Sequence, residues 1–172
     1  MIQTKLKKIK LLLLDVDGIL TDGSILYTDR GEEIKTFNAK DGLGIKLLIN
    51  AGIKVGIITG RQSRALTSRC KDLGIDLVFD GIQNKINALE TILKHTNISN
   101  EETAFAGDDL PDLPVMKRVG LSFTVPDASC HVIDRADIIT VLKGGHGAVR
   151  EICEDILKAK NLWEKTMADF LL

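Results

Sequence analysis

The chain has 172 residues, of which 44% are hydrophobic and 27% are charged, and its formal net charge at pH 7 is −1. This length fits about one domain with a full hydrophobic core, so we expect a single domain over residues 1–172. The nearly balanced charge offers nothing to attract nucleic acid or an anionic membrane surface, and neither is an expected partner.

The N-terminal residues briefly resemble a signal peptide, because a basic stretch precedes the apolar residues 11–14. Asp15 and Asp17 interrupt that apolar run early, and no segment reaches the roughly 18 apolar residues of a membrane span. The three cysteines are widely spaced, which predicts free thiols rather than a disulfide framework or a zinc site. We therefore expect a cytoplasmic protein.

Short apolar runs alternate with helical patterns along the chain. The strand-like runs cover residues 9–16, 54–60, 77–81, 103–109, 121–125 and 136–142. The helix-like patterns cover residues 41–52, 63–74, 84–95, 112–120 and 146–160. This alternation predicts an α/β fold with a Rossmann-like, doubly wound and mostly parallel sheet that carries helices on both faces.

One segment interrupts the alternation after the first strand. Residues 22–38 hold two strand-like runs around a tight turn at residues 29–31, which predicts an inserted β-hairpin. We interpret Asp22 as a turn-forming residue at the entrance of this hairpin rather than as a metal ligand.

Near the end of the chain, a glycine-rich stretch precedes the last helix. We interpret it as a flexible entry to that helix rather than as a phosphate cradle; its glycines are Gly144, Gly145 and Gly147. The tail, about residues 160–172, is too short for a domain and too apolar to be purely solvated. Its Trp163 and Phe170 either anchor on a neighbouring subunit or are loosely ordered.

Acidic residues follow two of the predicted strands. Asp15 and Asp17 are two positions apart, so an extended backbone points both side chains to the same side. Asp108 follows the fourth strand, and the carboxyl ends of parallel strands meet at one crevice. Three carboxylates around one point repel each other unless a cation lies between them. Oxygen ligands without histidine or cysteine favour Mg²⁺.

Phosphate-binding groups follow the other strands. Thr59 and Lys85 can hold phosphoryl oxygens, and Gly18 and Gly60 permit close approach of the backbone. A carboxylate beside a metal ion and a lysine can attack phosphorus and form an aspartyl phosphate. A second carboxyl two residues away can protonate the leaving oxygen and then deprotonate water. The residues therefore predict phosphoryl-transfer chemistry.

Four motifs resemble, in order, the signatures of the haloacid-dehalogenase-like phosphatases: DVDGILTDG, IITGR, the lysine of IQNK, and GDDLPD. TFNAKDGLGIKLL, ITGRQSRALTSRC, GDDLPDLPVMKRVGLS and GGHGAVREIC are similar to the family of 3-deoxy-D-manno-octulosonate 8-phosphate phosphatases. The resemblance covers about residues 10–160. It implies a Mg²⁺-dependent enzyme of lipopolysaccharide precursor biosynthesis that releases the free sugar acid and inorganic phosphate. It also implies no cap domain, and a homotetramer in which the hairpin and neighbouring tails cover the sites.

The resemblance implies roles for individual residues. Asp15 would be the nucleophile, and Asp17 the general acid and base. The side chains of Asp15 and Asp108, with the backbone carbonyl of Asp17, would bind Mg²⁺. Thr59 and Lys85 would bind the phosphoryl group. Two further aspartates would orient the metal-bound water and the lysine: Asp109 and Asp112.

Substrate-binding residues are also implied by the resemblance. They are Asn38, Lys40, Asp41, Gly42, Lys46, Gly60, Arg61, Arg69 and Lys85. An α-keto acid carries a carboxylate, which cationic side chains recognise well. Solvated surface positions are the alternative for the arginines and lysines outside the motifs.

Three other functions fit parts of the pattern. A phosphatase for a nine-carbon, sialic-acid-like keto acid 9-phosphate is the alternative within the same class. A non-enzymatic receiver-like phospho-switch also combines acidic residues, Mg²⁺, a threonine and a lysine. Its acceptor follows a middle strand, however, and it needs no acid and base two residues away. A catalytically silent assembly partner would have no use for Asp17.

Overall fold

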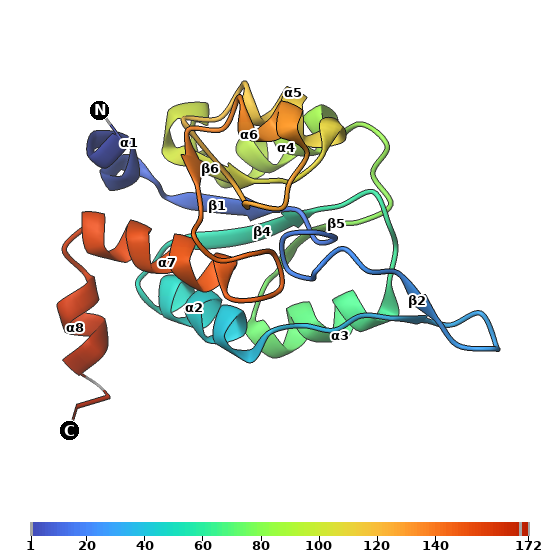
Figure 1. Ribbon diagram of the computed structural model, residues 1–172. Helices are drawn as coiled ribbons and strands as arrows, with labels where there is room; N and C mark the ends of the chain where they lie inside the picture. Colours follow the sequence, from blue (N-terminus) through green and yellow to red (C-terminus); the bar gives the residue numbers. More distant parts are fainter. Residues whose placement is uncertain (1, 169, 172) are drawn as a thin grey trace.

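The computed structural model describes residues 2–168 and 170–171 and contains a six-stranded sheet (Figure 1). The strand order is β5-β4-β1-β6-β7-β8, and every neighbouring pair is parallel. The strands are β1 (Leu11–Leu14), β4 (Lys54–Ile58), β5 (Leu77–Phe79), β6 (Thr103–Ala106), β7 (Leu121–Thr124) and β8 (Ile138–Ile139). The predicted α/β fold with a doubly wound parallel sheet is confirmed.

The four leucines of β1 form the centre of the core. All four side chains are fully buried, because β1 has a neighbouring strand on each side and helices on each face. Leu12 and Leu14 pack into one apolar cluster, whereas Leu11 and Leu13 pack into the other. A strand buried on both faces shows a continuous apolar run instead of alternation.

Two layers of helices cover the sheet (Figure 1). One layer contains α2 (Ala39–Asn50), α3 (Arg64–Leu73) and α7 (Ala148–Ala159). The other contains α4 (Lys85–Thr96), α5 (Leu113–Met116) and α6 (Cys130–Ile133). Three of these helices begin at a side-chain cap that accepts a backbone N–H: Asn38, Ser63 and Asn84.

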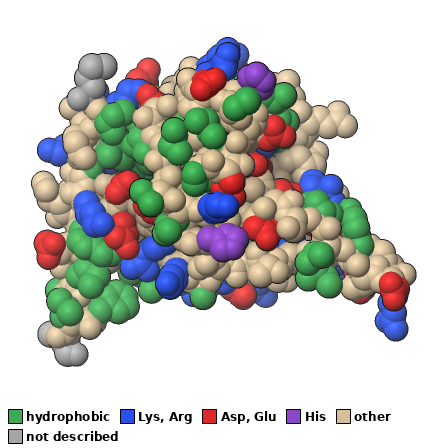
Figure 2. All heavy atoms as spheres, in the orientation of Figure 1, with side chains coloured by type: hydrophobic (Ala, Val, Ile, Leu, Met, Phe, Trp, Pro, Cys, Tyr) green, Lys and Arg blue, Asp and Glu red, His purple; other side chains and the backbone are tan. Residues whose placement is uncertain are grey.

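The inserted hairpin is formed by β2 (Leu26–Tyr27) and β3 (Glu33–Ile34). Gly31 turns the chain with a φ of 76°, a value that favours glycine. The hairpin projects away from the sheet, with hydrophobic side chains along its length and charged side chains at its tip (Figures 1 and 2). The prediction of a hairpin after the first strand is confirmed, and the described residues form no cap domain.

Two short terminal helices were not predicted. They are α1 (Ile2–Lys8), which buries Leu6 in the core, and α8 (Trp163–Ala168). Trp163 lies against α7 of its own chain, with its ring 5.8 Å from the guanidinium of Arg150 and 5.2 Å from Lys158 Nζ. These cation–π contacts hold α8 on the body of the molecule.

Other differences from the predicted elements are small. Single 3₁₀ turns lie at η1 (Asn100–Glu102) and η2 (Leu110–Asp112). The last strand is shorter than predicted, because the N–H of Val141 bonds the Glu151 carboxylate at 2.8 Å instead of a neighbouring strand. Residues 1, 169 and 172 of the predicted domain and tail lie outside the described residues. Within residues 2–168 and 170–171, no helix is long and apolar enough to cross a membrane.

Candidate active site

A cavity of about 520 Å³ lies at the carboxyl ends of β1, β4 and β6. Ligands of doubly wound sheets bind at this edge. The structure brings all of the predicted catalytic and metal-binding residues to this cavity. It is lined by Asp15, Asp17, Gly23, Thr59, Gly60, Arg61, Ile82, Gln83, Lys85, Asp108, Asp109, Pro111 and Asp112.

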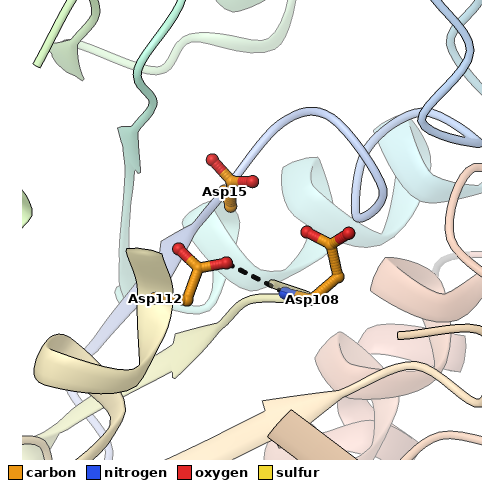
Figure 3. Close-up of side chains that lie close together, drawn as sticks. All are labelled: Asp15, Asp108 and Asp112. Atoms are coloured by element: carbon orange, nitrogen blue, oxygen red, sulfur yellow. Dashed lines mark hydrogen bonds between the residues drawn. The ribbon is translucent and has the colours of Figure 1, made fainter. Parts of the chain in front are cut away.

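Three carboxylates meet in this cavity: those of Asp15, Asp108 and Asp112 (Figure 3). Each offers an oxygen, and these oxygens all lie within 4.8 Å of one another. The carboxylate of Asp17, which the spacing argument expected beside those of Asp15 and Asp108, lines the same cavity but is not part of this group of three. The chain leaves the extended conformation after Asp15, since three backbone N–H groups in the next turn donate to the carbonyl of Val16.

Lys85 connects two of the three carboxylates. Its Nζ donates to Asp15 Oδ1 at 2.8 Å and to Asp112 Oδ1 at 2.6 Å. The other oxygen of Asp112 accepts the backbone N–H groups of Asp108 and Asp109 at 3.0 and 3.2 Å. Both oxygens of Asp112 are therefore engaged. The carboxylates of Asp15 and Asp108 are the ones available to a hard cation such as Mg²⁺.

Burial and mutual repulsion perturb these groups. Burial, followed by the charge of Asp112, raises the pKa of Asp15 to about 6, although Lys85 opposes the shift. Burial, followed by the charge of Asp15, raises the pKa of Asp108 to about 7. Burial works against the charged form of Lys85, but Asp15 and Asp112 outweigh it and raise the pKa of Lys85. One lysine does not compensate three carboxylates, so the site favours a further cation.

Two glycines allow the loop after β1 to pack closely. Gly18 has a φ of 91°, and a Cβ on it would lie 2.1 Å from Asp108 Oδ2. A Cβ on Gly144 would lie 1.8 Å from the carbonyl oxygen of Gly18. The N–H of Gly145 also bonds the carbonyl of Ile19 at 3.0 Å. The glycine-rich stretch before α7 is thus packed against the loop that follows Asp15, which corrects the prediction of a flexible entry.

The end of β4 contributes the predicted phosphate-binding threonine. Thr59 is 2% exposed, and its backbone N–H and C=O bond Phe79 and Ile82. Its Oγ1 accepts the N–H of Arg61 at 3.4 Å. Gly60 beside it leaves open space above the backbone, because the nearest atom to an added Cβ lies 3.8 Å away. This opening faces the same cavity.

Residues of the hairpin contact two side chains that line the cavity, Asp17 and Arg61, although these contacts were not predicted. Lys35 Nζ donates to Asp17 Oδ1 and lies 2.9 Å from Glu33 Oε1. Glu33 Oε2 in turn accepts Arg61 Nη2 at 2.7 Å, and the same nitrogen donates to the hydroxyl of Tyr27 at 2.7 Å. Glu33 lies on β3, and Lys35 directly follows that strand, two positions later. In an extended segment residues two positions apart share a face, which was a signal that could have revealed them.

The other predicted substrate-binding residues lie outside the cavity lining. Asn38 caps α2 and donates to Gly145 O at 3.2 Å, while Arg69 donates to Asn38 O at 3.0 Å. Asp41 is 1% exposed, and its Oδ1 accepts the N–H of Arg150 in the first turn of α7 at 2.8 Å. The remaining three are buried Gly42 and exposed Lys40 and Lys46.

Comparisons with known proteins agree with this geometry. A family model described as haloacid dehalogenase-like hydrolase matches residues 77–152. The 3-deoxy-D-manno-octulosonate 8-phosphate phosphatase of Salmonella typhi is 46% identical over 159 residues, which cover 92% of this chain and 85% of that protein. The chain belongs to the 3-deoxy-D-manno-octulosonate 8-phosphate phosphatase family.

Solved structures of this family have the same fold. The structure of the Moraxella catarrhalis phosphatase, in complex with a magnesium ion, a phosphate ion and a molecule of the sugar acid, has a TM-score of 0.96 and 44% identity. The match covers 98% of this chain and 97% of the Moraxella catarrhalis chain. A cobalt-bound form from Haemophilus influenzae has a TM-score of 0.93 and 42% identity, covering 98% and 99% of the two chains. The chain is therefore a phosphoric monoester hydrolase of the haloacid-dehalogenase-like class.

Proposed function

We propose that this chain hydrolyses 3-deoxy-D-manno-octulosonate 8-phosphate to the free sugar acid and inorganic phosphate. The observation that carries the proposal is the meeting of Asp15, Lys85 and Asp108 at the ends of three segments far apart in sequence. High identity to curated phosphatases over most of the chain supports the choice of substrate. The product would enter lipopolysaccharide precursor biosynthesis in the cytoplasm.

The proposed reaction has two steps. The carboxylate of Asp15 attacks phosphorus, the bond from phosphorus to the sugar oxygen breaks, and Asp17 gives its proton to that oxygen. Water then attacks the aspartyl phosphate, Asp17 takes the proton of the water, and inorganic phosphate leaves Asp15. Lys85 and Thr59 bind the phosphoryl oxygens throughout, and Asp112 holds Lys85 in place.

Magnesium is the cofactor of this proposal. The donor set fits it, because Asp15 and Asp108 offer hard oxygen ligands. Their pKa values are raised by burial and then by the charges of neighbouring carboxylates, which a cation would offset. The backbone carbonyl of Asp17 would be the third protein ligand. When bound, Mg²⁺ neutralises charge on the phosphoryl group and so lowers its repulsion for the attacking carboxylate. Asp109 at the cavity rim would orient the metal-bound water.

We also propose that the chain is one domain that assembles as a homotetramer with its sites at subunit interfaces. Six of the residues proposed to bind the sugar acid lie outside the cavity of their own chain: Asn38, Lys40, Asp41, Gly42, Lys46 and Arg69. They would either serve the site of a neighbouring subunit or hold the loops of their own site in place. Gly60 and Arg61 would contact the substrate within the same chain. Exposed apolar side chains on the hairpin support an interface there.

A panel of phosphorylated sugar acids tests the substrate. Purified protein with Mg²⁺ is given the eight-carbon 8-phosphate and a nine-carbon keto acid 9-phosphate, and released phosphate is measured. We expect a higher kcat/KM for the eight-carbon substrate. A preference for the nine-carbon substrate would replace the proposal with the sialic-acid-like alternative. The absence of metal-dependent hydrolysis of any ester, including p-nitrophenyl phosphate, would refute the enzymatic function altogether.

A further inference from the structure

Lys35 is a buried cation on a projecting element. It directly follows β3 of the hairpin, which extends away from the sheet (Figure 1). Nevertheless, its side chain is only 2% exposed. It is buried because it reaches from the hairpin to the carboxylate of Asp17, with Glu33 as its second partner at 2.9 Å. Burial works against the charge of Lys35, but these two contacts outweigh it and raise the pKa of Lys35.

The contact with Lys35 distinguishes the two oxygens of Asp17. Oδ1 accepts the ammonium of Lys35, so it is engaged. Oδ2 lies 3.8 Å from Arg61 Nε, and no hydrogen bond from the described residues reaches it. Asp17 also lines the cavity, and its side chain is 20% exposed. One oxygen is therefore fixed by the hairpin, while the other is available for proton transfer at the cavity.

Further contacts fix the hairpin itself. Glu33 pairs with both Lys35 and Arg61, and Arg61 also bonds the hydroxyl of Tyr27 on the opposite strand of the hairpin. We call Asp17, Lys35, Glu33 and Arg61 the ion-pair chain. It connects the loop after β1, the hairpin and the loop after β4, so the position of the hairpin determines where Lys35 holds Asp17.

We propose that Lys35 is a positioning residue that orients the general acid and base Asp17, so that the inserted hairpin takes part in leaving-group protonation. This inference rests on the proposed role of Asp17. A purely structural role for Lys35, in which it only attaches the hairpin to the body, predicts a different response to the leaving group. An ester with a poor leaving group needs the proton of Asp17, whereas p-nitrophenolate leaves without one.

The test compares variants on two phosphate monoesters, p-nitrophenyl phosphate and a simple alkyl phosphate. Lys35→Met removes the charge at similar length, and Lys35→Arg retains a cation. Arg30→Met is the matched control, because Arg30 is an exposed cation at the tip of the same hairpin, outside the ion-pair chain. For Lys35→Met we expect kcat on the alkyl ester to fall by at least about tenfold and kcat on p-nitrophenyl phosphate by less than about threefold. Lys35→Arg should recover most of the loss, and Arg30→Met should match the wild type.

Equal losses of kcat on both esters would overturn the proposal, as would a change in KM alone. If Lys35→Met unfolds in a thermal melt, Glu33→Gln replaces it, since this change removes one partner of Lys35 without burying a new charge. It should give the same leaving-group dependence at smaller magnitude, and equal losses would again refute the proposal.

A second set of variants separates this inference from the proposed role of Asp17. In the Asp17→Asn background, Lys35→Met should have almost no further effect, because the group that it orients is gone. The same fold-loss in both backgrounds would refute the inference. If Asp17→Asn itself shows no leaving-group dependence, the proposed role of Asp17 fails instead.

Discussion

At the scale of single residues, the site is defined by negative charge that the protein leaves incompletely compensated. Asp15 and Asp112 share one lysine, and Asp108 has no ion-pair partner among the described residues. An ionised carboxylate is costly to bury without a partner. A bound cation would offset the repulsion between these carboxylates. Two predictions follow from these charges.

The first prediction concerns the proposed nucleophile, Asp15. Asp15→Asn is nearly isosteric and retains a hydrogen-bonding partner for Lys85, but an amide oxygen does not form the phosphoryl intermediate. We expect turnover to fall by at least about 10³-fold with little change in the melting temperature. Phosphate release on p-nitrophenyl phosphate and a thermal melt measure both. Asp29→Asn in the exposed hairpin turn should behave as the wild type. Hydrolysis by Asp15→Asn near the wild-type rate would disprove the assignment.

The second prediction concerns how pH and Mg²⁺ together affect the stability of the protein. The pKa values of Asp15 and Asp108 are raised from 3.8 to about 6 and about 7. Between about pH 4 and pH 7, these two carboxyls therefore hold more protons in the metal-free folded protein than in the unfolded chain, and their contribution to the free energy of unfolding falls as the pH rises. Mg²⁺ bound to the ionised carboxylates would oppose this loss. Added Mg²⁺ should raise the melting temperature more at about pH 7.5 than at about pH 5.

Melts with EDTA provide the reference for that experiment, and the Asp108→Asn variant provides the control. This variant should show a smaller stabilisation by Mg²⁺ at neutral pH. A Mg²⁺ effect that is equal at both pH values would show that these carboxylates do not bind the metal ion.

At the scale of elements, the loop after β1 rests on the stretch before α7, and α2 in turn holds the first turn of α7. The glycine-rich stretch before α7 packs directly on Gly18, and Asp41 of α2 accepts the first-turn N–H of Arg150. Gly147, which precedes α7, has no side chain to cap the helix, so a carboxylate from a neighbouring helix does so. The helix layer formed by α2 and α7 thus positions the catalytic loop.

Gly144→Ala tests this packing. Its Cβ would overlap the carbonyl oxygen of Gly18, which must then move together with the loop that carries Asp17. We expect a loss of stability of about 2–3 kcal/mol and lower turnover. Gly52→Ala is the control, because nothing lies within 4 Å of a Cβ added to Gly52, although its φ of 85° is positive. It should cost only about 1 kcal/mol, with turnover unchanged. Equal effects of Gly144→Ala and Gly52→Ala on turnover would argue that this packing does not position the loop after β1.

At the scale of the whole molecule, the hairpin projects from the body of the described chain (Figure 1). Its strands have only two residues each, and an isolated two-stranded hairpin is marginal in water. Leu26 and Ile34 pair directly across it and are 52% and 48% exposed. The ion-pair chain holds the hairpin from one side, and these side chains leave an apolar surface free for a second copy.

Replacing the side chains of Leu26 and Ile34 tests the proposed assembly into a homotetramer. Leu26→Lys with Ile34→Lys places like charges on the apolar surface, so we expect a smaller oligomer than the wild type and reduced activity towards the sugar acid phosphate. Light scattering during gel filtration measures the mass. Arg30→Ser at the tip of the hairpin is the control. An unchanged mass for the double variant would place the subunit interface elsewhere.

The fold class could be predicted from the sequence, and the same pattern led to the reacting groups proposed above. Apolar runs and helical periodicity identified the strands of the parallel sheet and most of its helices. Most of the proposed catalytic residues follow the ends of those strands, and Lys85 begins the helix after β5, so their convergence could be expected from topology. The short helices α1 and α8 and the extent of β8 were missed, because their residues are ordered by contacts with the rest of the molecule rather than by a local pattern.

Only the tertiary structure decided which side chains meet. Lys85 lies 70 positions from Asp15, and Asp41 lies 109 positions from Arg150. Local spacing placed the carboxylate of Asp17 beside that of Asp15, but the turn after β1 directs it to Lys35 on the hairpin. Periodicity reports the direction of a side chain only while the backbone remains regular. The loops that build this site are irregular, and packing between distant segments sets their conformation.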